Sequence, residues 1–351
     1  MSYKENKMKA LILKEYNNLE YIDMDRPVIK SDDEVLINVK ACGICGSDVH
    51  GMDGSSGRRI PPIVMGHEAA GVIAEVGKNV TQWAQGDKVT FDSTIYCGKC
   101  HFCQQGYINL CDNRRVVGVS CVDYRQHGAF AEYIVIPQRI LYKLPDGVTF
   151  EQATMFEALS IAFHGVRRTP IVLNDTAVVV GAGMIGLLVI QSLRLAGCGN
   201  IIAVDIDDGK LNLAKKMGAD FGFNSSTVNV KEEVLNLTHK RGADCAFEVV
   251  GISPAVNTGI EVIKKGGSVT LIGNIRAQID FPLQTVVTRE ITLYGSCASN
   301  GEYPACIDMI VRKKIDVDSL ISAVAPLSEG ISWFKRLYKR EPGLMKVILR
   351  P

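Results

Sequence analysis

Four of the eleven cysteines stand close together at a spacing that suits a metal ion. Gaps of two, two and seven residues separate Cys97, Cys100, Cys103 and Cys111. Thiolates two residues apart can bind one tetrahedral ion, and four thiolates complete a closed shell with no open position. The spacing therefore predicts a structural zinc that orders a turn-rich lobe, at about residues 93–115.

Two other interpretations of this lobe stay open. An iron–sulfur cluster of the bacterial type needs its fourth cysteine after a gap of about three residues, with a proline next. Here that gap is seven residues and Asp112 follows the fourth cysteine. Four unrelated core cysteines are the remaining alternative, which zinc-like spacing disfavours.

A glycine-rich turn is the second motif with a defined chemistry. Gly181-Ala182-Gly183-Met184-Ile185-Gly186 directly follows an expected strand at 177–180 and opens an expected helix at 184–196. In that context Gly181 permits a tight turn, Gly183 lets the backbone approach a pyrophosphate, and Gly186 allows close packing of helix and strand. The free N–H groups of the helix start favour the phosphates. A plain turn with structural glycines is the alternative.

An acidic residue stands where this motif needs one. Asp205 lies 19 residues after Gly186, at the end of the next expected strand, 201–204. Its carboxylate can accept hydrogen bonds from the adenosine ribose hydroxyls. A 2′-phosphate there would meet Asp205, with Asp207 and Asp208 close by and no adjacent arginine. The sequence therefore predicts NAD rather than NADP.

The motifs sit in elements of two different textures. Up to about residue 150 the pattern indicates short strands and many turns, including strands at 70–76 and 88–91 and an alternating segment at 35–39 that only Leu36 interrupts. A helix is expected over 151–166. From Asp175 onward strands and helices alternate, which predicts a parallel sheet covered on both faces. The expected strands are 177–180, 201–204, 244–250, 268–272 and 291–294, and the expected helices are 184–196, 210–217, 230–240 and 255–265. The chain ends in a strand-like run, Lys346 to Leu349.

The bulk composition sets limits on the class of protein. With 351 residues, two domains are expected. The formal net charge of +1 gives no basic surplus for nucleic acid or an anionic membrane. The polar start, residues 1–9, has no signal-like apolar stretch, and no apolar run approaches the roughly 20 residues that span a bilayer. We therefore expect a cytoplasmic protein whose cysteines are reduced or bind metal.

Three further segments carry a set of metal-ligand residue types. They are Cys-Gly-Ile-Cys-Gly-Ser-Asp-Val-His at 42–50, Gly-His-Glu-Ala-Ala-Gly at 66–71 and Phe-Glu-Ala-Leu-Ser-Ile-Ala-Phe-His at 156–164. Each alone is modest evidence. Together with the cysteine lobe, the glycine-rich turn and the terminal Lys-Val-Ile-Leu, they stand in the order of a known family. The chain resembles the zinc-containing medium-chain alcohol dehydrogenases, and within them the sorbitol (polyol) dehydrogenase branch, with galactitol-1-phosphate dehydrogenases as close relatives.

The resemblance implies an α/β fold of two domains. A GroES-like, β-rich catalytic domain would span 1–157 and contain the zinc lobe. A Rossmann NAD-binding domain, a doubly wound parallel sheet, would span 158–296. Residues 297–351 would return to the catalytic domain. Members are usually homodimers or homotetramers, often joined through Rossmann sheet edges, for which residues 291–297 are the candidate.

The resemblance also implies roles at a catalytic zinc. Cys45 and His67 would bind the metal. Glu68 and Glu157 match two acidic positions, one of which binds the zinc while the other binds it or its water; which glutamate lies closer stays open. The zinc would act as a Lewis acid that lowers the pKa of the substrate hydroxyl. Ser47 would accept the hydroxyl proton and His50 would pass it to solvent, although an exposed turn histidine is the alternative for His50.

The same comparison implies further contacts with NAD. They lie in the phosphate turn, near the adenosine ribose and beside the nicotinamide, and they are Met184 and Ile185, then Lys210, then Ile272, Gly273 and Asn274.

The sequence departs from the polyol branch in the expected substrate pocket. Sorbitol dehydrogenases carry an arginine and an aromatic residue where this chain has Cys297-Ala298-Ser299. In turn, Arg58 and Arg59 lie in a loop that lines the substrate entrance in this family. Paired arginines could hold a phosphate or carboxylate of the substrate. A solvated loop is the alternative.

Three functions follow from these observations. The leading hypothesis is a zinc-dependent oxidoreductase that transfers a hydride from a secondary alcohol of a polyol or polyol phosphate to NAD, giving a ketose-type product. The same chemistry on a simple secondary alcohol, a diol or an aldose is the second. A non-catalytic NAD-binding protein of the same fold is the third, and it would predict loss of the zinc ligands. All three imply a small-molecule ligand, no nucleic acid and no membrane.

Overall fold

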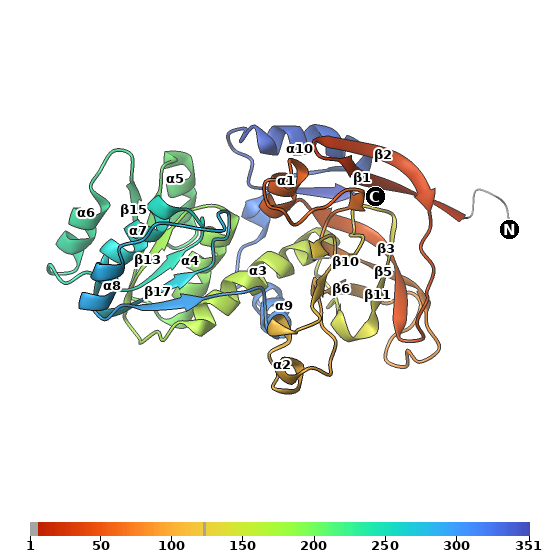
Figure 1. The fold of residues 1–351 in the computed structure, drawn as a ribbon, viewed down its shortest axis with the longest axis horizontal. Coiled ribbons are helices and arrows are strands. Elements are labelled where there is room, and N and C mark those ends of the chain that lie inside the picture. The colour runs from red at the N-terminus through yellow and green to blue at the C-terminus, as the bar shows by residue number, and fades with distance from the viewer. Residues whose placement is uncertain (1–5, 122–123) are drawn as a thin grey trace. The chain divides into compact units, whose positions relative to one another are not determined.

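The computed structural model describes residues 6–121 and 124–351. Residues 1–5, part of the polar start noted above, and residues 122–123 lie outside the described residues. The chain divides into two compact units (Figure 1). Unit 1 comprises Met1–Glu157, Tyr303–Val311 and Val317–Pro351, and unit 2 comprises Ala158–Glu302 and Arg312–Asp316.

Unit 1 is built mainly from antiparallel strands. Its largest described sheet has the order β12-β6-β5-β3-β20-β19, with β11 paired to β3. These strands are β3 (Glu34–Gly43), β5 (Glu68–Val76), β6 (Lys88–Phe91), β11 (Tyr133–Pro137), β12 (Leu141–Lys143), β19 (Ile321–Pro326) and β20 (Lys346–Arg350). Smaller sheets contain β1 (Lys7–Glu15), β2 (Asn18–Asp25), β4 (Ile63–Val64), β7 (Thr94–Ile95), β8 (Arg115–Val116), β9 (Ser120–Cys121) and β10 (Tyr124–Arg125).

Strand β3 lies inside this sheet and explains the interrupted alternation noted above. Val35, Leu36 and Ile37 are all at most 1% exposed, so both faces of the strand are covered. A strand covered on both faces needs no polar face, and Leu36 is therefore not an anomaly. The register pairs Gly43, the last residue of β3, with Glu68 of β5. Gly43 also pairs with Ile348 of β20.

The helices of unit 1 are short. They include α1 (Gly46–Met52), α2 (His101–Gln104), α9 (Tyr303–Val311) and α10 (Gly330–Tyr338), and the 3-10 turns η2 (Ile108–Leu110), η3 (Gln138–Ile140), η4 (Asp318–Leu320) and η5 (Leu327–Glu329). Helix α3 (Phe150–Arg168) supplies residues to both units. Phe130 and Phe334 pack edge to face in the core of unit 1, with ring centroids 5.6 Å apart.

Unit 2 contains a parallel sheet with the order β15-β14-β13-β16-β17-β18. Its strands are β13 (Thr176–Val180), β14 (Asn200–Asp205), β15 (Phe221–Asn224), β16 (Ala243–Glu248), β17 (Ile263–Leu271) and β18 (Thr292–Gly295). The connecting helices are α4 (Met184–Ala196), α5 (Asp208–Lys216), α6 (Val230–Leu237), α7 (Ser253–Glu261) and α8 (Leu283–Thr288). The strand order reverses beside β13, which is the doubly wound order of dinucleotide-binding folds.

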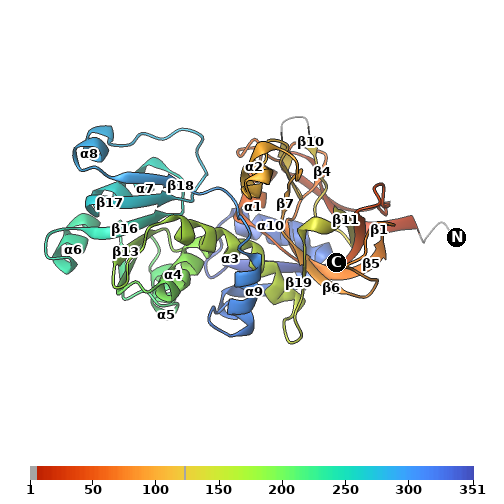
Figure 2. The same ribbon diagram turned by 90° about the horizontal axis from the view of Figure 1, so that it is seen from below.

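The helices of unit 2 form two groups. Helix α4 contacts β13, β14 and α5, whereas α7 contacts β13, β16, β17 and α6 (Figure 2). The helices of both groups cover the apolar strands of the sheet, as expected for a parallel sheet. The dinucleotide motif therefore leaves β13 at the point where the strand order reverses.

Most expected elements are confirmed within a few residues, but one helix end is wrong. The expected helix 255–265 ends at Glu261, and Ile263 already begins β17. Val262 and Ile263 are β-branched and fully buried in the core of unit 2. Ile263 pairs with Ala243 of the neighbouring strand, so tertiary packing overrides the helix preference of Lys264 and Lys265.

No helix within residues 6–121 and 124–351 combines the length and the apolar character that a membrane crossing requires.

Candidate active site and cofactor site

Three of the four expected catalytic ligands lie together in unit 1. The ligand atoms of Cys45, His67 and Glu68 are all within 4.8 Å of one another. Cys45 stands between β3 and α1, while His67 and Glu68 lie where β5 begins. Because Gly43 and Glu68 are paired, the end of β3 and the start of β5 bring these side chains together.

Two atoms of this cluster are available to a metal ion. Glu68 Oε1 is buried and has no hydrogen-bond partner among the described residues. Asp48 Oδ1 lies 3.4 Å from His67 Nδ1, which leaves Nε2 as the nitrogen available to a metal. A sulfur, an imidazole nitrogen and a carboxylate oxygen form a donor set that catalytic zinc uses. The residues therefore fit zinc, which would supply a Lewis acid for the substrate oxygen.

Lys346 joins this cluster from the far end of the sequence. Its Nζ lies 2.5 Å from Glu68 Oε2, and their side chains are 3% and 1% exposed. Gly43 leaves the space that the Glu68 carboxylate occupies. Burial lowers the pKa of Lys346, but the charges of Glu68, Cys45 and Glu157 and the hydrogen bond to Glu68 together outweigh burial and raise that pKa. The sequence interpretation missed this role, for which the available signal was a lysine at the start of an apolar strand.

Asp48 and Arg59 form a second buried ion pair next to His67. Arg59 Nη2 donates to Asp48 Oδ1 at 3.0 Å and to Ser47 Oγ at 3.1 Å. Burial opposes ionisation of Asp48, but the charges of His67 and Arg59 hold the pKa of its carboxyl below the usual range. Arg59 is 3% exposed, so it differs from both expectations for it, an anchor facing the substrate and a solvated loop residue. Arg58 beside it is exposed.

Glu157, the fourth expected ligand, lies outside the group defined by the 4.8 Å limit. Ser93 Oγ donates a hydrogen bond to its Oε1 at 3.4 Å. Burial raises the pKa of Glu157 to about 7, with the charge of Glu68 adding to the rise and His67 opposing it. The carboxyl of Glu157 thus interacts electrostatically with the cluster from a greater distance than Glu68.

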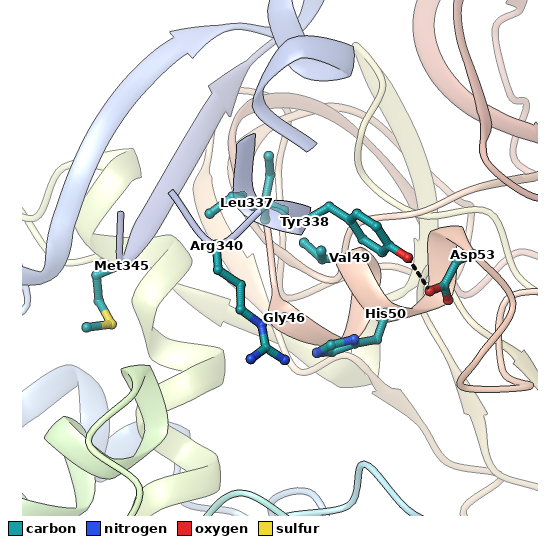
Figure 3. Close-up of a pocket in the computed structure, with 9 residues that line it drawn as sticks. Gly46, Val49, His50, Asp53, Leu337, Tyr338, Arg340 and Met345 are labelled. Carbon is teal, nitrogen blue, oxygen red and sulfur yellow. Dashed lines mark hydrogen bonds between the residues drawn. The ribbon is translucent and has the colours of Figure 1, made fainter. Parts of the chain in front are cut away.

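His50 lies near the end of α1 and lines a cavity of about 410 Å³ in unit 1. Arg340 also lines this cavity, and its guanidinium and the His50 ring point toward one another (Figure 3). Tyr338 borders the same cavity and donates a hydrogen bond to Asp53 Oδ2 at 2.9 Å. His50 is half-buried on a helix, unlike an exposed turn histidine.

The four-cysteine lobe also forms a compact cluster. The sulfur atoms of Cys97, Cys100, Cys103 and Cys111 lie within 4.8 Å of one another. The backbone N–H of Cys97 donates to Cys111 Sγ at 3.2 Å. Backbone N–H groups, that of Lys99 first, lower the pKa of Cys97 to about 6, although burial opposes them. Four sulfur donors with N–H groups directed at them fit a closed zinc shell.

The glycine-rich turn joins β13 to α4 as expected. Gly181 has a φ of +104°, which favours glycine. A Cβ on Gly186 would overlap the Gly181 carbonyl oxygen, whereas a Cβ on Gly183 would meet nothing within 4 Å. The backbone at Gly183, at the N-terminus of α4, is therefore open to an approaching group, while Met184 and Ile185 form the first residues of the helix.

Asp205 holds the same turn in place. Its carboxylate accepts hydrogen bonds from the backbone N–H groups of Ala182 at 2.7 Å and Ile206 at 2.8 Å. Lys210 lies in the first turn of α5, whose start is capped by the side chain of Asp207. These positions put Asp205 and the glycine-rich turn side by side at the carboxyl ends of β13 and β14.

The expected nicotinamide segment follows β17. The Ile272 and Gly273 N–H groups donate to the Glu248 carbonyl at 2.9 and 3.0 Å. A Cβ on Gly273 would overlap the backbone at Val250 and Gly251, so this close approach requires glycine. Asn274 is exposed after it.

Comparison with known proteins agrees with this architecture. Residues 31–146 match the alcohol dehydrogenase GroES-like domain, and residues 185–312 match the zinc-binding dehydrogenase domain. The chain is 34% identical over 329 residues to the D-xylulose reductase A of Aspergillus oryzae, covering 92% of this chain and 91% of that protein.

Two solved structures are similar over nearly the whole chain. Galactitol-1-phosphate dehydrogenase from Escherichia coli has a TM-score of 0.90 and 26% identity, covering 98% of this chain and 100% of that one. An alcohol dehydrogenase from Escherichia coli CFT073, complexed with NADH, has a TM-score of 0.91 and 28% identity, covering 99% and 100%.

The fold and the matched domains define a zinc-binding dehydrogenase. The chain belongs to the zinc-dependent medium-chain alcohol dehydrogenase family. Membership confirms the expected α/β architecture, with a GroES-like part and a Rossmann part, and it confirms zinc and NAD as the cofactors. The chain is an enzyme, and the alternative of a non-catalytic NAD-binding protein is set aside.

Proposed function

We propose that this enzyme oxidises a secondary alcohol of a polyol to a ketose with NAD. The cluster of Cys45, His67 and Glu68, with the buried Glu68 Oε1 lacking a partner among the described residues, is the observation that carries the proposal. This cluster supports a catalytic zinc site, and a D-xylulose reductase is among the relatives that are similar to this chain.

The side chains around the cluster would divide the work. Cys45, His67 and Glu68 would bind the zinc, which would supply a Lewis acid for the alcohol oxygen. Glu157, with its pKa raised to about 7, is the more distant acid and would act on a water molecule of the site. Ser47 accepts the hydroxyl proton and His50, half-buried on the same helix, passes it towards solvent. The glycine-rich turn and Asp205 orient NAD for the hydride, whose chemistry belongs to the cofactor.

The arginines favour a neutral polyol over a polyol phosphate. Arg59 already donates to Asp48 and Ser47, so it is not free to clamp a phosphate together with Arg58. A single exposed arginine offers a weaker anion site than a pair. The phosphorylated substrate remains the second candidate, because galactitol-1-phosphate dehydrogenase has a similar structure.

A matched panel tests both candidates. The zinc-loaded protein would be assayed for NAD reduction with pentitols, hexitols, their phosphates and simple diols, alongside a chelated sample. We expect the neutral polyols to give the highest kcat/KM and the chelated sample to be inactive. A phosphate ester that exceeds its parent polyol by about tenfold or more, which is about 1.4 kcal/mol of transition-state binding, would reverse this preference. Activity on diols alone would overturn the polyol assignment.

The edge of the unit 2 sheet is the surface through which we expect copies of the chain to associate. Strand β18 ends the sheet order, and the nearby helix α8 exposes Leu283 and Val287 by 63% and 64%. An edge strand can pair with that of a second copy, and the exposed apolar side chains would then be covered. Light scattering of the wild type and of Val287→Glu would test this homo-oligomer. A wild type that is monomeric would contradict it.

A further inference from the structure

We propose that Arg59 is a positioning residue of the active site, which fixes the Ser47 hydroxyl and the Asp48 carboxylate relative to each other and to His67. The part that concerns Ser47 rests on the proposed function. The part that concerns Asp48 and His67 rests only on the metal-ligand cluster.

One guanidinium holds both neighbours. Arg59 Nη2 lies 3.0 Å from Asp48 Oδ1 and 3.1 Å from Ser47 Oγ, while Nε lies 3.3 Å from the same Asp48 oxygen. The side chains of Arg59 and Asp48 are 3% and 0% exposed, so water competes little for the contact between these two residues. The planar fork of an arginine fixes the angle between its donors, which the single nitrogen of a lysine cannot do.

Asp48 transmits this constraint to the ligand residues. Its Oδ1 faces His67 Nδ1 at 3.4 Å, and its Oδ2 accepts a hydrogen bond from the Cys45 backbone N–H at 3.4 Å. A carboxylate behind a ligating imidazole fixes the orientation of the ring. Arg59 therefore acts on two of the three clustered ligands through one carboxylate.

The chain leaves room for the arginine and anchors it on both sides. A Cβ on Gly51 of α1 would overlap Arg59 Cγ, so the glycine makes space for the arginine stem. Ser120 holds the flanking backbone, because its N–H donates to the Arg58 carbonyl at 3.0 Å and its Oγ accepts from the Ile60 N–H at 3.0 Å. The side chain is thus directed inward by its surroundings rather than left to sample solvent.

The contact also sets how Ser47 can act. A hydroxyl has one donor and two acceptor sites. Arg59 occupies one acceptor site of Ser47 Oγ, which leaves the other acceptor site for the alcohol and the O–H for onward donation. Without Arg59 the hydroxyl would rotate among several partners, and proton transfer would depend on its finding the productive one.

The test compares Arg59→Met and Arg59→Lys with Arg139→Met, which removes an exposed arginine–aspartate pair of the same unit. Zinc affinity is measured by chelator competition, and kcat, KM for NAD and the solvent deuterium isotope effect are measured on zinc-saturated protein. For Arg59→Met we expect about 10–100-fold weaker zinc binding at the catalytic site and a similar loss of kcat, as for other residues that support metal ligands. KM for NAD should stay near that of the wild type, and the isotope effect should rise because Ser47 is no longer held. Arg59→Lys should recover only part of each loss, and the control should behave as the wild type.

A second variant reaches the same side chain without removing its charge. Gly51→Ala should displace the Arg59 stem and reproduce the losses of Arg59→Met, although alanine favours the helix itself. In an Arg59→Ala background the Gly51→Ala change should cost little more, because the stem is already absent. Folded Arg59→Met protein with the zinc affinity, kcat and isotope effect of the wild type would overturn the proposal. If the wild type oxidises no polyol, the proposed function fails, and the zinc affinities of the same variants still decide the role of Arg59.

Discussion

Replacing Lys346 with methionine should destabilise the metal-free protein strongly. The Lys346 and Glu68 side chains are 3% and 1% exposed, and their charged atoms are 2.5 Å apart. If one partner is removed, water cannot solvate the charge of the other. Removing one partner of a buried pair leaves the other charge uncompensated, which typically costs about 3–5 kcal/mol. We expect the free energy of unfolding of Lys346→Met in chelator to fall by about that amount.

Zinc should reduce this deficit. The second oxygen of Glu68 has no partner among the described residues, so a bound cation would compensate the carboxylate that the lysine leaves behind. The variant should therefore bind zinc at least as tightly as the wild type while being less stable without it. Urea unfolding followed by tryptophan fluorescence measures both, because Trp83 and Trp333 both belong to unit 1.

Two further proteins make the measurement decisive. Lys9→Met removes a pair of the same unit whose side chains are 43% and 60% exposed, so it should change the free energy of unfolding little. Adding Glu68→Gln to Lys346→Met removes the stranded charge and should restore part of the lost stability. The reasoning is refuted if Lys346→Met in chelator is no less stable than Lys9→Met, or if zinc leaves its deficit unchanged.

Three other changes give sharp expectations. Cys103→Ser should reduce the zinc content from two ions per chain to one and speed proteolysis of the lobe, and retention of both ions by elemental analysis would contradict a closed four-sulfur shell. Asp205→Ala should lower kcat/KM with NAD by about 10–100-fold, because hydrogen bonds to a charged group contribute about 1.5–3 kcal/mol. It should also reduce the ratio of kcat/KM with NAD to kcat/KM with NADP. If that ratio is unchanged, the result counts against the role of Asp205. Burial opposes ionisation of Glu302, but the hydrogen bond with His164 at 2.9 Å, the charge of His164 and the backbone N–H groups of Asn300 and Glu302 together lower the pKa of Glu302. Its contribution to stability is therefore present above the ordinary pKa of 4.5 and is lost as the pH falls through the lower folded value. Glu302→Gln should cost about 1–3 kcal/mol at neutral pH and progressively less in acid, and an equal cost at both would show that the charge is not involved.

The parts of the structure that sequence predicted are those coded locally. The alternation of apolar strands with helices predicted the parallel sheet, and the glycine-rich motif predicted the tight turn between β13 and α4. Each of these patterns depends on residues a few positions apart, so the chain carries the information in one segment. The cysteine lobe is local in the same sense, since Cys97 and Cys111 are 14 positions apart.

The parts that sequence did not predict depend on contacts across the fold. Lys346 meets Glu68 across 278 positions, and nothing in either segment names the other as its partner. Arg59 was expected in a loop that faces substrate or solvent. Its side chain points inward instead, because the space at Gly51 and the acceptor at Asp48 set its direction. The residue types were visible, but which way a side chain turns is decided by neighbours that only the folded chain assembles.

The two buried ion pairs have a common consequence for the metal site. Glu68 is matched by Lys346 and Asp48 by Arg59, so each of these carboxylates has its own cation close to the ligand cluster. A bound zinc would then not serve mainly as their counter-ion, and more of its charge would act on the alcohol oxygen. The two lysine and arginine variants should therefore fail differently. Lys346→Met should keep zinc but have a low kcat. Without Lys346, the Glu68 carboxylate would neutralise more of the zinc charge, and less of that charge would act on the alcohol oxygen. Arg59→Met should lose zinc affinity and turnover together, because the orientation of His67 would be lost.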